Sequence, residues 1–331
     1  MPYAVQAVRA GGPEVFETVE VPRPAPGPGQ LLVKVSAAGV NFIETYQRSG
    51  VYPVSYPFTP GSEAAGTVEE VGPGVEGFAP GDRVASSDGA GTYAEYALFP
   101  AGKSFPVPDG VDDGVAAALP LQGMTAHYLI NSSYNVKPGD TALTYAGAGG
   151  VGLLLTQLLK LRGATVITTT STPEKAELAR GAGADHVLDY ADVPDKVREL
   201  TGGRGVDVVY DGIGKDTFES SLKSLRTRGT LVLFGGASGQ VPPFDLQRLN
   251  ALGSLSVTRP KLADFTRDAE EVRWRSSEIM GLVADGRLSV RIDALYPLAD
   301  AGRAHTALES RATTGKLLLV PNTSPLAGGL S

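Results

Sequence analysis

The chain has 331 residues and a net charge of -7, and 42% of its residues are hydrophobic and 20% charged. This length exceeds what one hydrophobic core usually supports, so it predicts two domains. The acidic balance disfavours nucleic acid as a partner, because phosphate binding needs a basic face. Cysteine is absent, which excludes disulfides, iron–sulfur clusters and thiolate zinc sites.

The opening segment MPYAVQAVRAGGPEVFE has neither the basic start nor the continuous apolar core of a signal peptide. No apolar run in the sequence approaches the roughly 18 residues that indicate a membrane-spanning helix. We therefore expect a cytoplasmic protein that does not use a membrane.

Residues 1–123 contain short apolar or alternating runs separated by turn clusters rich in Pro and Gly. VFETVEVP, LLVKVSAAGV and GTYAEYALF are typical of strands, and VGPGVEGFAPGD is typical of tight turns. The pattern predicts a compact, barrel-like all-β domain over residues 1–123, without a catalytic helix.

Residues 124–260 follow a different rhythm, in which apolar strands alternate with helical patterns. The spacing of about 20 to 25 residues is what βα units require. The expected strands begin near Ala142, Thr165, His186, Val206, Thr230 and Ser254. Six such units predict a doubly wound parallel sheet, a Rossmann fold.

Residues 261–331 offer too few elements to fold alone. They contain one amphipathic helical segment, VRWRSSEIMGLVADG, and two strand-like pieces, RIDALYPL and GKLLLVP. We expect this segment to return to the first domain and complete it. The end, PNTSPLAGGLS, is rich in Pro, Gly and Ser and predicts a flexible tail from about residue 322.

The stretch TYAGAGGVGLLLTQ, residues 144–157, places a G-x-G-x-x-G pattern between a predicted strand and a predicted helix. Gly147 and Gly149 allow a pyrophosphate to approach the backbone, and the amides of Gly150 and Val151 face it at the positive end of the helix. The alternative is a glycine-rich loop that only packs the strand on the helix.

The second strand of this domain ends in TTTSTPEK, without the acidic residue that binds the ribose hydroxyls of NAD. Lys175, helped by the Ser171 hydroxyl, is available for a 2′-phosphate, so NADPH is favoured over NADH. Both residues have a structural alternative: Ser171 and Glu174 form a capping box that starts a helix, and Lys175 is a solvated helix residue.

The chain resembles the zinc-independent, zeta-crystallin-like quinone oxidoreductase branch of the medium-chain dehydrogenase/reductase superfamily. The resemblance rests on AGVNFIETYQRSGVYP, PGSEAAGTVEEVG, GFAPGDRV, LPLQGMTAHYL, AGAGGVGLLLTQ, GVDVVYDGIGKDTF and RATTGKLLLVP, which span residues 1 to about 321. It implies a GroES-like catalytic domain beside the Rossmann domain. It also shows one departure, because this branch more often has alanine where Gly147 stands, a change that we expect to be conservative.

The resemblance implies that no metal is bound. Zinc alcohol dehydrogenases of this superfamily use a cysteine in the segment matching AGVN and a histidine in the segment matching PGSEAAG, where this chain has Asn41 and Ser62. Glu63 remains, but one carboxylate without thiolate or imidazole partners is a poor zinc site. The three histidines are not spaced as a ligand set.

The resemblance also implies the residues around the nicotinamide. Asn41, Tyr46 and Tyr52 are the expected catalytic residues, because Asn41 can hold a carbonyl or carboxamide and a tyrosine hydroxyl can donate a proton to the reduced oxygen. The tyrosines have the alternative of half-buried loop aromatics. The further cofactor contacts that the resemblance implies are Phe42, Ile43, Thr125, Tyr128, Gly150, Val151, Ser171, Lys175, Tyr190, Phe234, Gly235, Gly236 and Arg311.

Two of these contacts have other interpretations: Arg311 can be a solvated arginine, and Tyr190 can belong to the core at a strand edge.

The activity that we expect is NADPH-dependent reduction of small quinones without metal, since electron-poor acceptors need little Lewis-acid help. The alternatives are a 2-alkenal or enone reductase and a non-enzymatic, crystallin-like or RNA-associated NADPH-binding protein. Relatives associate through a sheet edge, so we expect a homodimer or tetramer through SLSVT, residues 254–258.

Overall fold

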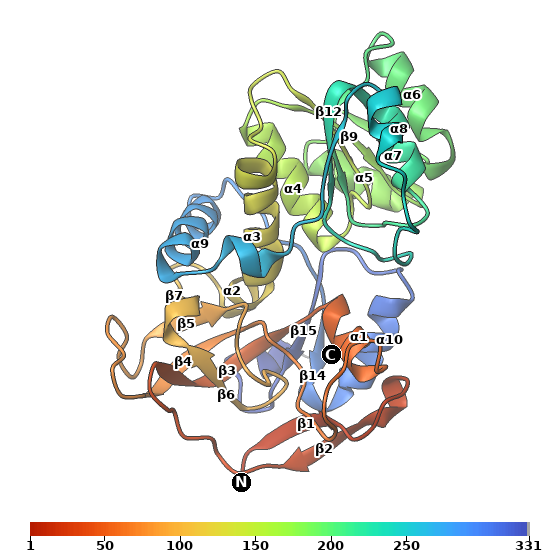
Figure 1. Ribbon diagram of the computed structural model, residues 1–331. Coiled ribbons are helices and arrows are strands. Elements are labelled where there is room, and N and C mark those ends of the chain that lie inside the picture. Colours follow the sequence, from red (N-terminus) through yellow and green to blue (C-terminus); the bar gives the residue numbers. More distant parts are fainter. Residues whose placement is uncertain (330–331) are drawn as a thin grey trace. The chain divides into compact units, whose positions relative to one another are not determined.

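The computed structural model describes residues 1–329 and divides the chain into two compact units (Figure 1). The first unit comprises Met1–Met124 together with Thr266–Ser331, and the second comprises Thr125–Phe265. No helix within the described residues combines the length and the apolar character needed to cross a bilayer.

A seven-stranded sheet is the body of the first unit (Figure 1). Its strands are β3 (Gln30–Val40), β4 (Ala64–Val71), β5 (Arg83–Ser86), β6 (Tyr96–Pro100), β7 (Ser104–Pro106), β14 (Ile292–Pro297) and β15 (Lys316–Val320). The order is β14-β15-β3-β4-β5-β7, and β6 pairs with the long β3. β15 lies antiparallel to β3, so the C-terminal segment shares a sheet with the N-terminal one. A separate antiparallel pair is formed by β1 (Tyr3–Ala7) and β2 (Phe16–Glu20).

The first unit also contains helices, so the all-β prediction for residues 1–123 is wrong. Its α-helices are α1 (Phe42–Arg48), α2 (Asp113–Ala118), most of α3 (Pro120–Tyr128), α9 (Ala269–Ala284) and α10 (Ala301–Glu309). Single 3-10 turns are η1 (Pro13–Val15), η2 (Ala101–Lys103) and η6 (Leu298–Asp300). With seven residues, α1 is too short to show helical periodicity in the sequence. A 3-10 helix, η7 (Pro325–Gly329), lies in the segment predicted to be a flexible tail, and residues 330–331 lie outside the described part.

The second unit confirms the predicted Rossmann sheet. Its parallel strands are β8 (Thr141–Thr144), β9 (Thr165–Thr169), β10 (His186–Leu188), β11 (Val206–Asp211), β12 (Leu225–Leu233) and β13 (Ser256–Thr258), in the order β10-β9-β8-β11-β12-β13. Its helices are α4 (Gly150–Leu161), α5 (Pro173–Gly181), α6 (Val193–Leu200), α7 (Phe218–Ser224) and α8 (Gln247–Ala251), with shorter turns η3 (Leu129–Ser133), η4 (Tyr190–Asp192) and η5 (Leu262–Phe265). β12 begins at Leu225 instead of near Thr230, because the strand continues through Arg228 although this residue has a φ of 61°.

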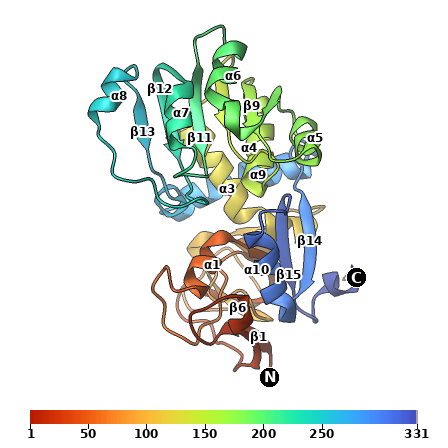
Figure 2. The same ribbon diagram turned by 90° about the vertical axis from the view of Figure 1, so that its right-hand side faces the viewer.

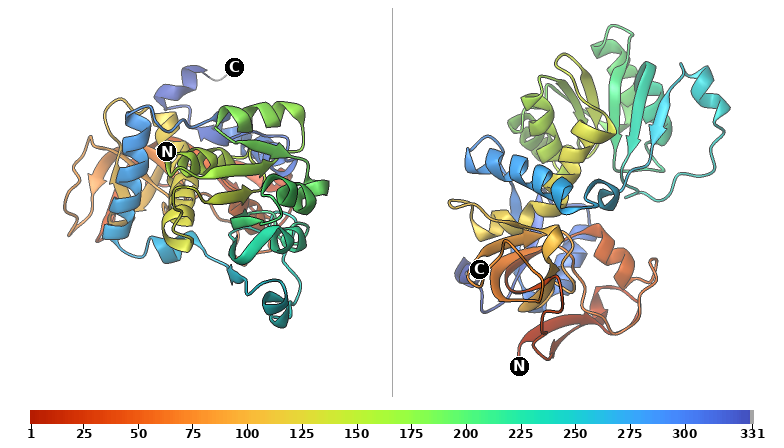
Figure 3. Two further views of the ribbon diagram at one scale, coloured as in Figure 1. Left: turned by 90° about the horizontal axis from the view of Figure 1, so that it is seen from above. Right: turned by 60° about the vertical axis from the view of Figure 1, so that its left-hand side comes forward.

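The segment between β12 and β13 forms an arm on the second unit. Figure 2 shows β13 at the edge of the sheet with α8 beside it, and Figure 3 shows the same cyan segment extending outward with α8 near its tip. Phe244 anchors the arm by edge-to-face contact with Phe218, at 5.1 Å between ring centroids. Leu246 is 72% exposed and Val257 on β13 is 38% exposed, so this edge presents apolar side chains to its surroundings.

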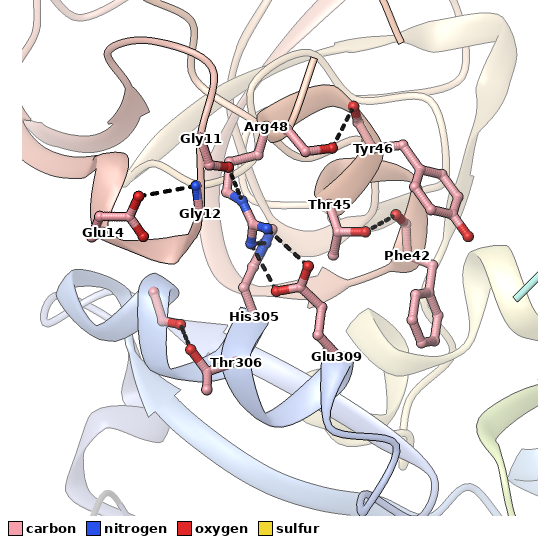
Figure 4. Close-up of polar contacts among 12 residues, drawn as sticks. Gly11, Gly12, Glu14, Phe42, Thr45, Tyr46, Arg48, His305, Thr306 and Glu309 are labelled. Atoms are coloured by element: carbon pink, nitrogen blue, oxygen red, sulfur yellow. Dashed lines mark hydrogen bonds and ion pairs between the residues drawn. The ribbon is translucent and has the colours of Figure 1, made fainter. Parts of the chain in front are cut away.

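Helix α1 is fastened to α10 by a buried arginine (Figure 4). Arg48 is 3% exposed and binds both carboxylate oxygens of Glu309, at 2.8 and 3.1 Å. Its Nη1 also lies 3.1 Å from Nδ1 of His305, whose Nε2 lies 3.0 Å from the Tyr93 hydroxyl. Because a guanidinium only donates, Nδ1 of His305 accepts from Arg48, and its Nε2–H donates to Tyr93.

Burial, aided by the charge of Arg48, lowers the pKa of His305 from 6.5 to about 3. Between these values the unfolded chain binds a proton that the folded protein does not. His305 therefore contributes stability above pH 6.5 that is lost as the pH falls towards 3.

We predict that His305→Gln reduces the loss of stability at acid pH. Glutamine keeps an acceptor for Arg48 and a donor for Tyr93 but does not titrate. The free energy of unfolding, measured in urea, should fall between pH 7 and pH 3 by up to about 4 kcal/mol more in the wild type than in the variant. His186→Gln, at an exposed histidine, is the matched control and should behave as the wild type. If the free energy of unfolding falls equally with pH in His305→Gln and in the wild type, His305 does not cause the loss of stability at acid pH.

Candidate active site

The glycine loop of the second unit connects β8 to α4 and leaves the start of α4 open to an anion. Gly149 is the N-cap, has no side chain to cap the helix, and is followed by a first turn without acidic residues. The loop is closed by bonds from the Gly147 amide to the Thr169 carbonyl and from the Gly149 amide to the Ala146 carbonyl, both 2.9 Å. The amides of Gly150 and Val151 lie in the first turn of this 12-residue helix. A pyrophosphate fits this end by charge and by hydrogen-bonding capacity.

Two glycines of the loop are required by close contacts. A Cβ at Gly152 would lie 2.3 Å from the Ala146 carbonyl oxygen. A Cβ at Gly147 would lie 2.4 Å from Oγ1 and 2.7 Å from Cγ2 of Thr168, a residue that is fully buried in β9. An alanine at position 147, which this branch more often has, would fit this chain only if Thr168 or the loop moved, because the Thr168 side chain occupies the space.

The end of β9 carries hydroxyl side chains in place of an acid. Thr168, Thr169 and Thr170 are all buried, and the chain then turns into α5. The N-cap of α5 is Thr172, whose hydroxyl accepts from the Lys175 amide at 3.3 Å, with Pro173 in the first turn. The predicted capping box, with Ser171 as the N-cap and Glu174 as its partner, is therefore wrong. The N-cap lies one residue later, at Thr172.

Ser171 is left exposed and lines a cavity of about 520 Å³ within the second unit. The cavity is lined by residues of the β9–α5 turn, by Arg180 of α5 and by the end of β10, including Asp189. Arg180 pairs with Glu177 at 2.5 Å. The geometry leaves the Ser171 hydroxyl available to a ligand.

Tyr190 lies beside the glycine loop. Its hydroxyl accepts a bond from the Ala146 amide at 3.2 Å, and its ring stacks near Tyr145 with 6.0 Å between centroids. Ala146 has a φ of 54°, which turns its amide towards that hydroxyl. The ring of Tyr190 also packs against the hydrophobic core of the second unit, so both interpretations of this residue describe part of its surroundings.

Phe234, Gly235 and Gly236 follow β12 and are held by the end of β11. The amides of Phe234 and Gly235 donate to the Asp211 carbonyl at 2.9 and 3.3 Å. The buried Asp211 carboxylate fixes the loop after β11, by accepting from the amides of Ile213 and Gly214 and the hydroxyls of Thr217 and Ser221. A Cβ at Gly235 would lie 2.4 Å from the Gly212 carbonyl oxygen, so glycine is required there.

The two predicted cofactor residues on α3 are deeply buried. Thr125 is 7% exposed and Tyr128 is 2% exposed. The ring of Tyr128 stacks in parallel on Phe265, with 4.4 Å between centroids. One face of Tyr128 is therefore covered by protein.

In the first unit, α1 and the loop after it carry four predicted residues. Phe42, Ile43 and Tyr52 are 36%, 42% and 45% exposed, and the rings of Tyr46 and Tyr52 lie 5.5 Å apart. Figure 4 shows Phe42 and Tyr46 on the side of α1 away from the Arg48 guanidinium. Desolvation raises the pKa of Tyr46, and the nearby charge of Arg311 acts in the opposite direction. Arg311, which has a φ of 58°, thus neighbours Tyr46 within this unit.

Asn41 is the N-cap of α1 and is 6% exposed. Its amide Nδ2 donates to Glu63 at 2.9 Å, and its Oδ1 accepts from the ammonium of Lys316 at 2.6 Å. Both ends of the side-chain amide are therefore already bonded within the protein, whereas the sequence suggests an amide available to a ligand.

Comparison with known proteins places the chain in a family. It matches the alcohol dehydrogenase GroES-like domain over residues 27–109 and the zinc-binding dehydrogenase family over residues 150–272. A quinone oxidoreductase of Pseudomonas aeruginosa is 44% identical over 321 residues, which cover 96% of this chain and 99% of that protein. The chain belongs to the quinone oxidoreductase branch of the medium-chain dehydrogenase/reductase superfamily.

Two further members show the range of this branch. The structure of the Escherichia coli quinone oxidoreductase complexed with NADPH is 43% identical, with a TM-score of 0.93, and the match covers 96% of this chain and 100% of that one. A 2-haloacrylate reductase from a Burkholderia species is 43% identical over 323 residues, which cover 95% of this chain and 97% of that protein.

At the two positions where zinc-dependent members carry a cysteine and a histidine, this member of the branch has Asn41 and Ser62. Across residues 1–329, no cluster of three or more acidic or histidine side chains is arranged to hold a metal ion. The side chain beside Asn41 and Glu63 is instead the ammonium of Lys316.

Sequence reasoning missed Lys316, Thr168 and Asp211. Asp211 has a weak signal, an acid directly after the apolar run VDVVY. Lys316 precedes a run of four apolar residues that form a fully buried strand, which is unusual for a solvated lysine. Nothing in the sequence marks Thr168 as the neighbour of Gly147.

We predict that Gly147→Ala weakens NADPH binding by roughly tenfold, because the added methyl group displaces Thr168 or the loop. Gly147→Ala/Thr168→Ala should recover most of the affinity, since it removes the two closest atoms. Gly181→Ala, where a Cβ meets open space, is the matched control. Fluorescence titration with NADPH measures all three, and an unchanged affinity in Gly147→Ala would show that the loop tolerates the methyl group.

Proposed function

We propose that this protein is an NADPH-dependent quinone reductase that works without a metal ion. The observation that carries the proposal is the form of the nucleotide loop in a member of the quinone oxidoreductase branch. The N-terminus of α4 has no capping side chain. The neighbouring strand β9 ends in threonines and not in an acidic residue. The first feature suits a pyrophosphate, and the second suits a nucleotide whose ribose carries a phosphate.

The chain offers a binding group for each part of this cofactor. The amides of Gly150 and Val151 face the pyrophosphate, and the Ser171 hydroxyl and the Lys175 ammonium bind the 2′-phosphate. The Tyr190 hydroxyl accepts a hydrogen bond from the Ala146 amide of the glycine loop. When bound, NADPH supplies the hydride.

The side chains on and after α1 fit a flat, electron-poor acceptor. Phe42 and Ile43 offer exposed apolar surface. Tyr46 is a hydrogen-bond donor at neutral pH, since the ordinary tyrosine pKa of 10.0 is well above 7 and desolvation raises it further. A quinone gains a hydride and a proton to become a hydroquinone, and it spreads the developing negative charge over its ring, so donors from Tyr46 and Tyr52 are sufficient to stabilise it.

The test of this function is steady-state oxidation of NADPH and of NADH by the protein in the presence of a chelator. Ortho-quinones, para-quinones and an enone are supplied as separate acceptors. We expect quinone-dependent turnover with a clear preference for NADPH. The absence of turnover with every acceptor, despite tight NADPH binding, would contradict an enzymatic role.

A second candidate is an NADPH-dependent enone or 2-alkenal reductase. The observation that favours it is the 2-haloacrylate reductase relative, whose substrate by name is an activated alkene. The hydride then goes to carbon, and a tyrosine must protonate the neighbouring carbon or oxygen. Turnover with the enone alone would establish this candidate in place of the first.

We assign proton donation to Tyr52, the more exposed of the two paired tyrosines. Tyr52→Phe should lower kcat by about 10² while leaving the dissociation constant of NADPH unchanged, because the ring remains and only the hydroxyl is lost. Tyr3→Phe, at an exposed tyrosine of β1, is the control. Full turnover in Tyr52→Phe would move the role to another donor.

We assign recognition of the 2′-phosphate to Lys175. Lys175→Ala should weaken NADPH binding by about 10-fold and leave NADH binding unchanged, because only NADPH carries the phosphate. Lys223→Ala, at an exposed lysine of α7, is the control. Equal weakening for both nucleotides would indicate a general electrostatic effect.

We also propose a homodimer in the cytoplasm, assembled through β13. The proposal is supported by the edge position of β13, by the exposed Val257 on it and by the exposed Leu246 at the start of α8. Light scattering should give twice the chain mass of 34.3 kDa, and a monomer would contradict the assembly. Cell fractionation tests the location.

A further inference from the structure

A group of four polar side chains lies in the interior of the first unit, and the proposed reaction does not yet use all of them. Asn41 and Glu44 belong to the start of α1, Glu63 directly precedes β4, and Lys316 opens β15. Their exposures are 6%, 1%, 0% and 1%. We call them the buried polar cluster.

Lys316 is the centre of the buried polar cluster. Its ammonium lies 2.5 Å from Oε2 of Glu63 and 2.6 Å from Oδ1 of Asn41. The same Oε2 accepts from Nδ2 of Asn41 at 2.9 Å, which closes a triangle of three bonds. The other oxygen of Glu63 accepts from the Leu121 amide at 2.7 Å, so the carboxylate is fully engaged.

The backbone makes room for this arrangement. Gly39 of β3 pairs with Leu318 of β15, and a Cβ at Gly39 would lie 2.2 Å from Oε2 of Glu63 and 2.8 Å from Cε of Lys316. Only glycine leaves space for the Lys316–Glu63 pair at this point of the sheet.

The charges within the buried polar cluster balance when Glu44 is neutral. Burial raises the pKa of Glu44 to about 8, although the charge of Lys316 and the hydrogen bond from the Asn41 backbone amide act to lower this pKa. Oε2 of Glu44 accepts a hydrogen bond from the backbone amide of Asn41 at 2.6 Å. The other oxygen, Oε1, is buried without a hydrogen-bond partner. The ammonium of Lys316 is therefore left to neutralise Glu63.

We propose that Lys316 is a positioning residue that sets the orientation of the Asn41 side chain and, through it, the start of α1. A lysine ammonium only donates and an ionised carboxylate only accepts, so the pair dictates which end of the amide faces which partner. This inference rests on the proposed function in one respect, namely that side chains on and after α1 contact the acceptor.

Lys316→Met tests the inference, because methionine has similar length and no donor. The expected result is a fall in kcat of at least tenfold with quinone, while the dissociation constant of NADPH changes less than twofold. Lys137→Met, at an exposed lysine, should leave both unchanged. If the wild type itself shows no turnover, the proposed function fails; if the wild type and Lys316→Met turn over equally, only the positioning role fails.

A second variant separates orientation from stability. Lys316→Met/Glu63→Gln carries no uncompensated charge and should recover most of the melting temperature lost in Lys316→Met. Because the Leu121 amide keeps the oxygen of the new glutamine as its acceptor, the NH2 group of that glutamine faces Asn41 and bonds it only when the Asn41 amide is reversed. We therefore expect kcat to stay low. Recovery of kcat together with the melting temperature would show that Lys316 only neutralises Glu63, and would overturn the inference.

A third comparison asks whether Lys316 acts through Asn41. In an Asn41→Ala background there is no amide to orient, so adding Lys316→Met should change kcat by less than twofold. If the double variant loses kcat by the product of the two single-variant factors, Lys316 does not act through Asn41.

Discussion

The position of the residues that we propose to contact the acceptor depends on buried charged side chains at the two ends of one short helix. Helix α1 has seven residues, too few to be stable alone, because helix nucleation is costly and each end leaves backbone groups unpaired. At its start, Asn41 is held by Glu44, Glu63 and Lys316. At its end, Arg48 is held by Glu309 and His305. Removing one partner from the Lys316–Glu63 pair, which is buried on both sides, costs about 3 to 5 kcal/mol. The Arg48–Glu309 pair contributes less, because Glu309 is 37% exposed. Together these bonds hold the helix that carries Phe42 and Tyr46.

In the second unit, the arrangement follows from the geometry of a parallel sheet. The carboxyl ends of all its strands lie at one edge, which gathers the glycine loop after β8, the hydroxyl-rich end of β9 and the Phe234–Gly236 segment after β12. The Asp211 carboxylate fixes one loop, and Tyr190 contacts another. Both interactions use backbone amides as donors, so the surface that would receive the nucleotide is set largely by main-chain atoms.

Features that depend on local patterns were predictable from the sequence. The six βα units and the glycine loop were found because strand spacing and glycine positions are written in neighbouring residues. Helix α1 was missed because seven residues show no periodicity, and the start of β12 was misplaced because Arg228 and Gly229 interrupt its apolar run. Lys316 was missed because its partners lie 253 and 275 residues away, a distance over which no spacing rule applies.

The same long separations have a consequence for synthesis of the protein. Helix α1 is made early, but Glu309 and Lys316, which hold its two ends, are made only after the whole of the second unit. Until then, Arg48 and Glu63 lack their ion-pair partners, and β3 lacks its neighbour β15. Nascent chains therefore carry an unfinished first unit while Thr125–Phe265 is already complete, and loss of the C-terminal segment in a shortened product would remove both anchors of α1 at once.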